Sequence, residues 1–175
     1  MRQDLDVVDL HGNVDTRIRK LRGDNGLDGV VLAAAGLKRL GVEEEIAQYF
    51  SVHEMVPAVG QGVLAVQSRR SDTEVGRLLS AIDDGRVRTE ALCERAFLKA
   101  LGGDCRVPVG ASAELSGGLV SLVGVIASTD GRDFVTRTTR GRSEDAESIG
   151  RALAQELVET GGEHILGAPT EGGTR

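Results

Sequence analysis

The chain has no tryptophan, one tyrosine, three phenylalanines and two cysteines among its 175 residues. Because aromatic residues are so scarce, Val, Leu, Ile and Ala must build any core. Two cysteines in different contexts do not form a disulfide framework. No stretch approaches the ~20 consecutive apolar residues that cross a bilayer, and the N-terminus lacks the apolar core of a signal peptide. We therefore expect a cytoplasmic protein with free thiols and no membrane partner.

Positive charge is also in short supply. Twenty-one Lys and Arg residues face 27 Asp and Glu residues, a net charge of −6. This balance argues against a general nucleic-acid binder. Four basic residues nevertheless lie within six positions: Arg17, Arg19, Lys20 and Arg22. A local basic site on an acidic protein suits a small anionic ligand better than a polyanion.

The first third of the chain predicts part of an α/β domain. The expected elements are a strand at 5–10, a helix starting near Val14, a buried strand at 29–34, a helical turn at 36–40 and a helix around 43–49. Asn13 or Asp15 would cap the first helix. This order is typical of a doubly wound parallel sheet, but such a sheet needs more strands than these residues supply.

The remaining residues predict a complete α+β unit after a short strand and helix. The expected elements are a strand at 63–67, helices at 72–82 and 86–101, strands at 107–115, 119–127 and 134–140, and a closing helix at 143–160. In the long helix the expected apolar stripe includes Leu92, Ala96 and Leu98, with Cys93 as a nearby core residue. The glycine-rich tail 167–175 is expected to be disordered.

The other cysteine, Cys105, lies in a glycine-rich loop between a predicted helix and a predicted strand. Gly102 and Gly103 allow a bulky group to come close, and Arg106 beside the sulfur favours the reactive thiolate. This setting suits a cysteine that carries a group. The alternative is a small apolar residue in a turn. A redox or acyl-carrier role has little support because no resolving cysteine lies nearby.

Two arginines and one loop are candidate ligand contacts. Arg17 lies in the first turn of a helix, where free backbone N–H groups favour an anion. Arg39 follows a buried strand, at the edge where open α/β sheets bind ligands. Either arginine could instead be a solvated surface charge. The segment Gly60-Gln61-Gly62 is a hinge or a ligand contact, and no histidine spacing suggests a metal site.

Five motifs in order resemble one family, porphobilinogen deaminase, also called hydroxymethylbilane synthase. They are residues 10–17, 32–41, 57–62, 94–98 and 102–110. The resemblance implies three domains, of which the first two resemble periplasmic binding proteins and the third is a small α+β domain. Residues 1–56 would then be the C-terminal part of domain 2, residues 57–82 a return segment of domain 1 with its hinge, and residues 83–175 domain 3.

The resemblance also implies a chemistry. In the family a loop cysteine, here Cys105, holds a dipyrromethane cofactor through a thioether. Four porphobilinogen units are added with loss of ammonia, giving hydroxymethylbilane for tetrapyrrole (haem) biosynthesis. Arg17 and Arg39 match positions that bind the pyrrole carboxylates, and Asn13 belongs to the same motif as Arg17. Gly60-Gln61-Gly62 matches the hinge beside the cofactor.

Two departures from the family pattern matter. His11 stands where the family motif begins with an arginine, and a neutral histidine cannot replace a bidentate cation. The family's catalytic aspartate lies in a Ser-Leu-Lys-Asp-type motif that this chain lacks, together with the paired arginines, so no catalytic residue is assigned. We expect the chain alone to be inactive. It is either one piece of the enzyme, with the N-terminal half as a separate chain, or a non-catalytic binding module that retains the domain 3 fold.

Overall fold

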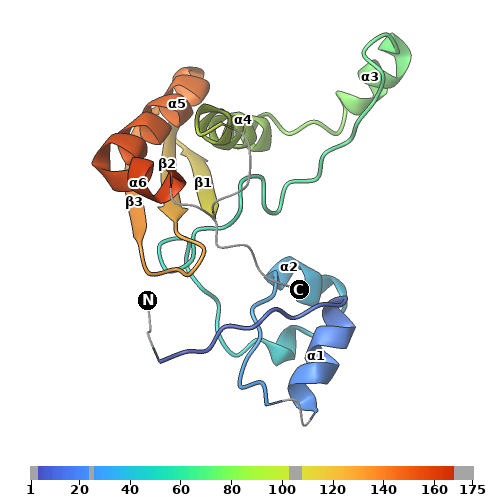
Figure 1. The fold of residues 1–175 in the computed structure, drawn as a ribbon. Coiled ribbons are helices and arrows are strands. Elements are labelled where there is room, and N and C mark those ends of the chain that lie inside the picture. The colour runs from blue at the N-terminus through green and yellow to red at the C-terminus, as the bar shows by residue number, and fades with distance from the viewer. Residues whose placement is uncertain (1–3, 24–25, 103–107, 168–175) are drawn as a thin grey trace. The chain divides into compact units, whose positions relative to one another are not determined.

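A computed structural model describes residues 4–23, 26–102 and 108–167. The chain separates into two compact units, Met1–Phe50 and Ser51–Arg175 (Figure 1). The first unit contains helices α1 (Val14–Arg22) and α2 (Ala34–Arg39) and the short 3-10 helix η1 (Glu43–Glu45). Across the described ranges, no helix combines the length and apolar character that a bilayer span requires.

Helix α1 begins where the sequence predicted it. Asn13 is its N-cap, and the Asn13 Oδ1 atom accepts a hydrogen bond from the backbone N–H of Thr16 at 2.9 Å. This bond satisfies one of the N–H groups that a helix start leaves unpaired. Ile18 from α1 and Leu37 from α2 are the buried apolar residues described in this unit. The helix prediction and the Asn13 cap are confirmed.

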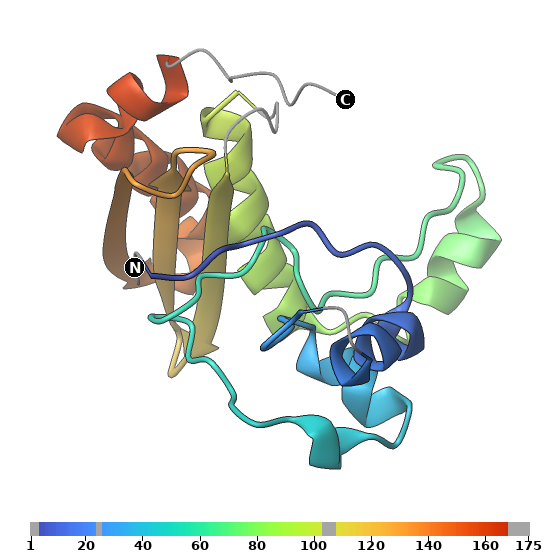
Figure 2. The ribbon, with the colours of Figure 1, turned by 60° about the horizontal axis from the view of Figure 1, so that its bottom comes forward.

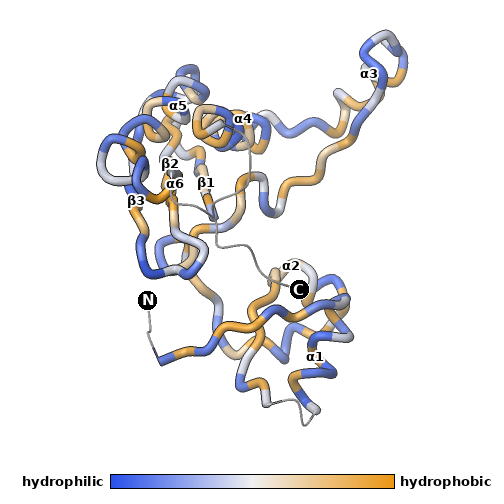
Figure 3. The backbone as a smooth tube through the Cα atoms, viewed as in Figure 1, coloured by the Kyte–Doolittle hydropathy of each residue, from blue (hydrophilic) through white to orange (hydrophobic). Residues whose placement is uncertain are grey.

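Both strands predicted for the first unit are wrong. Residues 5–10 and 29–33 have no regular secondary structure, and Ala34 begins α2. A strand needs a hydrogen-bonded neighbour, and no described segment pairs with either stretch. Their side chains are accordingly open to solvent, with Val7 81% and Val31 58% exposed. Figure 3 shows hydrophobic stretches along these extended residues.

The helix predicted around 43–49 is also wrong, because only η1 forms. The backbone becomes extended at Ile46, and the Tyr49 hydroxyl donates to Glu43 Oε1 at 2.7 Å. Three adjacent glutamates repel one another and disfavour a continuing helix, whereas the extended chain brings Tyr49 back to the first of them. Lys38 adds an ion pair to the same Glu43 carboxylate at 3.2 Å.

The second unit contains a three-stranded antiparallel sheet in the order β1-β2-β3. Its elements are α3 (Thr73–Leu79), α4 (Gly85–Ala100), β1 (Val109–Ser116), β2 (Leu119–Ala127), β3 (Phe134–Arg142), η2 (Ser143–Asp145), α5 (Ala146–Leu157) and α6 (Glu163–Gly167). The two-residue turn Gly117-Gly118 joins β1 to β2, as expected for a hairpin. Helices α4 and α5 pack on one face of the sheet (Figure 2). The predicted α+β unit is confirmed in this form, and β2 has the predicted bounds.

The core of this unit lies between the sheet and the helix pair. Its largest fully buried side chains are Phe97, Leu122, Ile126, Leu153 and Leu157. The predicted face of the closing helix is confirmed, because its apolar residues are buried. The predicted stripe of α4 is displaced by one residue: Leu92 is 43% exposed, whereas Cys93 and Phe97 are fully buried. Cys93 is therefore a core residue, as predicted.

Three further predictions for this unit need correction. No strand forms at 63–67, where Leu64 is 89% and Val66 62% exposed, again without a described pairing partner. The helix predicted at 72–82 is the shorter α3. The closing helix ends at Leu157, because Gly161 takes a φ of +122° in the turn before α6. Gly167 ends α6, and residues 168–175 lie outside the described residues.

Candidate functional site

The start of α1 places Arg17 beside the Gly12-Asn13 loop. The Arg17 Nε atom donates to the Gly12 carbonyl at 2.8 Å, and Lys20 Nζ donates to the His11 carbonyl at 3.0 Å. These two bonds fix the loop on the helix. Among the described residues, no acceptor lies within hydrogen-bond distance of the Arg17 Nη atoms. The outer edge of this guanidinium can therefore hold a carboxylate in a bidentate manner.

The two neighbouring candidates have more limited capacity. The Asn13 Oδ1 atom is engaged by the helix cap, which leaves its amide nitrogen as a donor. The His11 side chain is exposed. A neutral imidazole offers a single N–H donor, against the five donors of an arginine.

Arg39 belongs to the same unit as Arg17. It is the exposed last residue of α2, whose Gly36 lies 3.5 Å from Val14 Cγ2, measured from the position of an added Cβ. Arg22 and Lys38 in this unit form ion pairs with Glu45 and Glu43. Within the described ranges, Arg17 and Arg39 have no such acidic partner.

The predicted hinge, Gly60-Gln61-Gly62, is a tight double turn in the second unit. The Ala58 carbonyl accepts from Gln61 N at 3.0 Å, and the Gly60 carbonyl accepts from Val63 N at 3.2 Å. Gly60 and Gly62 have φ values of +75° and +83°, which side chains disfavour. A Cβ at either position would have no described atom within 4 Å, so the turn is open to close approach by a ligand.

One residue of this region was missed by the sequence reasoning. Glu94 of α4 is 8% exposed, yet it carries a carboxylate. Its Oε1 accepts from Ala113 N at 2.9 Å and its Oε2 from Gly60 N at 2.7 Å. Burial raises the pKa of the Glu94 carboxyl, and the bonds from Ala113 and Gly60 oppose that rise. The available signal was an acidic residue between two core positions of a helix.

Cys105 lies outside the described residues, as do Asp104 and Arg106. The chain nevertheless fixes which elements its loop connects. Helix α4 ends at Ala100, and β1 begins at Val109. The loop with Cys105 therefore joins the two elements that the Glu94 carboxylate bridges.

The other thiol, Cys93, is expected to be inert in the folded chain. Its burial, with the nearby Glu94 charge, raises the pKa of Cys93 to about 11. At pH 8 the thiolate fraction then falls about two hundredfold below that of an ordinary thiol with a pKa of about 8.5. Iodoacetamide labelling with peptide mapping should modify Cys93 at least that much more slowly in native than in urea-unfolded protein. Equal labelling rates would show that Cys93 is not a core thiol.

Comparison with known proteins places the two parts of the chain in one family. Residues 1–77 match the family described as "Porphobilinogen deaminase, dipyromethane cofactor binding domain", and residues 88–159 match "Porphobilinogen deaminase, C-terminal domain". The porphobilinogen deaminase of Roseiflexus castenholzii is 49% identical over 166 residues, covering 95% of this chain and 54% of the relative. That of Syntrophomonas wolfei is 46% identical over 165 residues, covering 94% and 54%.

These matches define a protein built from a cofactor-binding part and a small C-terminal α+β domain. The chain belongs to the porphobilinogen deaminase family. The resemblance inferred from the five motifs is thereby confirmed. The chain spans about half the length of the curated relatives that it matches.

Proposed function

We propose that the chain is the cofactor-carrying part of a transferase that condenses four porphobilinogen units into hydroxymethylbilane. The observation that carries this proposal is the match of residues 1–77 to the family's cofactor-binding domain. The unpaired Arg17 and Arg39 and the open turn at 60–62 support it. Each addition releases one ammonia, and hydrolysis releases the product.

The proposed roles follow from the donors that each residue offers. Cys105 anchors dipyrromethane through a thioether, and the bound cofactor supplies the pyrrole end to which units are added. Arg17 and Arg39 bind the acetate and propionate groups, which are anions at neutral pH. At the turn, Glu94 occupies the Gly60 N–H, so the Gln61 side chain and the Gly62 N–H are the donors that remain for the ligand. Asn13 contributes its amide nitrogen, and His11 binds a carboxylate more weakly than an arginine would.

We assign the domains as the resemblance implies: residues 1–56 to a periplasmic-binding-protein-like domain 2, residues 57–82 to domain 1, and residues 83–175 to domain 3. The exposed apolar segments 5–10, 29–33 and 63–67 support this assignment. Unpaired extended segments of this kind are suited to join a sheet whose other strands come from the rest of the family's length. The N-terminal half, as the same or a separate chain, is thus the proposed partner, and it would supply the catalytic aspartate.

The test is the intact mass of the chain purified from the organism that encodes it. We expect an adduct of two linked pyrrole units that disappears in Cys105→Ser. Cys93→Ala is the matched control, because it removes the buried thiol and should leave the adduct in place. An unmodified wild-type chain would contradict the carrier role and favour a non-catalytic module. An adduct that survives Cys105→Ser would place the attachment elsewhere.

A further inference from the structure

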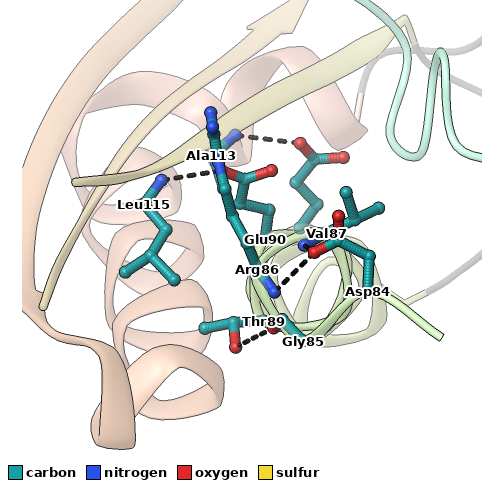
Figure 4. Close-up of polar contacts among 9 residues, drawn as sticks. Asp84, Gly85, Arg86, Val87, Thr89, Glu90, Ala113 and Leu115 are labelled. Carbon is teal, nitrogen blue, oxygen red and sulfur yellow. Dashed lines mark hydrogen bonds and ion pairs between the residues drawn. The ribbon is translucent and has the colours of Figure 1, made fainter.

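The outer edge of β1 is closed by groups that do not belong to a strand. In the sheet order β1 has only one neighbour, so alternate N–H groups face away from β2. Ala111 N donates to the Pro57 carbonyl at 3.0 Å. Ala113 N donates to Glu94, and Leu115 N to Glu90 Oε1 at 2.8 Å (Figure 4). One backbone carbonyl and two carboxylates of α4 therefore satisfy this edge.

Only one of the two carboxylates reaches a third segment. Glu90 binds Leu115 N and forms an ion pair with Arg86, its neighbour in α4. Glu94, one turn later, uses one oxygen for β1 and the other for Gly60 N. The adjoining backbone lies close to β1, since an added Cβ at Gly110 would come within 2.7 Å of the Pro57 carbonyl.

We infer that Glu94 is a positioning residue that fixes the turn at 60–62 to both elements flanking the Cys105 loop. The inference rests on the proposed function for the role of that turn and of Cys105. Glu94 lies six residues before the end of α4, or about 9 Å along the helix axis. A single buried carboxylate thus sets the turn, the helix and the strand at fixed distances from one another, close to the start of the cofactor loop.

Amide hydrogen exchange of the 175-residue chain tests the contact directly. Glu94→Gln keeps the shape of the side chain but has only one acceptor oxygen. We expect that oxygen to stay on Ala113 in the rigid sheet, so the Gly60 amide should exchange about tenfold to a hundredfold faster. Glu90→Gln is the matched control: it removes the same charge from the same helix face and should leave Gly60 unchanged.

Unchanged Gly60 exchange in Glu94→Gln would overturn the inference. Protected β2 and β3 amides would show that the variant is folded. If it is not folded, Glu94→Asp replaces it. This variant keeps the charge but is one methylene shorter, so it cannot reach both donors, and faster Gly60 exchange is again expected.

The adduct mass separates this inference from the proposed function. We expect a smaller fraction of cofactor-loaded chain in Glu94→Gln than in Glu90→Gln or wild type. If wild type carries no adduct, the proposed function fails, and the exchange data still decide whether Glu94 holds the turn. If Gly60 is released but the loaded fraction is equal in all three proteins, the turn is held by Glu94 without helping the cofactor site, and the inference is wrong.

Discussion

Gly150→Ala should destabilise the second unit by about 3 kcal/mol or more, at the upper end of overpacking effects. Gly150 lies in α5, where α5 packs closely on α4. A Cβ at this position would lie 2.2 Å from the Cys93 carbonyl oxygen and 2.9 Å from Phe97 N. Both atoms belong to the α4 backbone, so no side-chain rotation relieves the overlap and the helices must separate. Urea unfolding followed by circular dichroism measures the loss.

Gly76→Ala is the control for the same substitution in a helix. Gly76 lies in α3, and an added Cβ there would have no described atom within 4 Å. Alanine has the higher helix propensity, so stability should stay equal or rise by up to about 1 kcal/mol. Similar losses from the two variants would show that the α4–α5 contact is not the cause.

Local signals were enough to predict the elements whose determinants are local. The Asn13 cap depends on a bond to a residue three positions away, and the β1–β2 hairpin depends on two glycines between alternating strands. The closing helix carries its apolar face at regular spacing from Ala146 to Leu157. In each case the residues that form the element also determine its main contacts.

The failed predictions concern elements whose partners lie far away or outside the described chain. Alternating or apolar residues at 5–10, 29–34 and 63–67 are typical of strands, yet a strand forms only against a neighbour. The candidate site shows the same limit. Family motifs identified Arg17 and Arg39, but Glu94 bonds to groups 19 and 34 positions away. No periodicity in α4 indicates those contacts.

Phe97→Ala should remove about 3–5 kcal/mol of stability, which approaches the total stability of many small domains. Its side chain is fully buried, and its ring occupies the space that a side chain at Gly124 would need: an added Cβ there would lie 2.8 Å from Phe97 Cε2. Truncation leaves a cavity against a strand that has no side chain at this position to fill it.

Leu92→Ala gives the comparison that decides which stripe of α4 faces the core. Leu92 is 43% exposed, so its truncation should lower stability by no more than about 1 kcal/mol. Denaturant midpoints of both variants, measured by circular dichroism, should therefore differ widely. Comparable losses would restore the stripe through Leu92 and Leu98 that periodicity predicted. A large loss confined to Phe97→Ala would mean that α4 is rotated to present Cys93 and Phe97 to the core, which is the rotation that lets Glu94 reach Ala113 and Gly60.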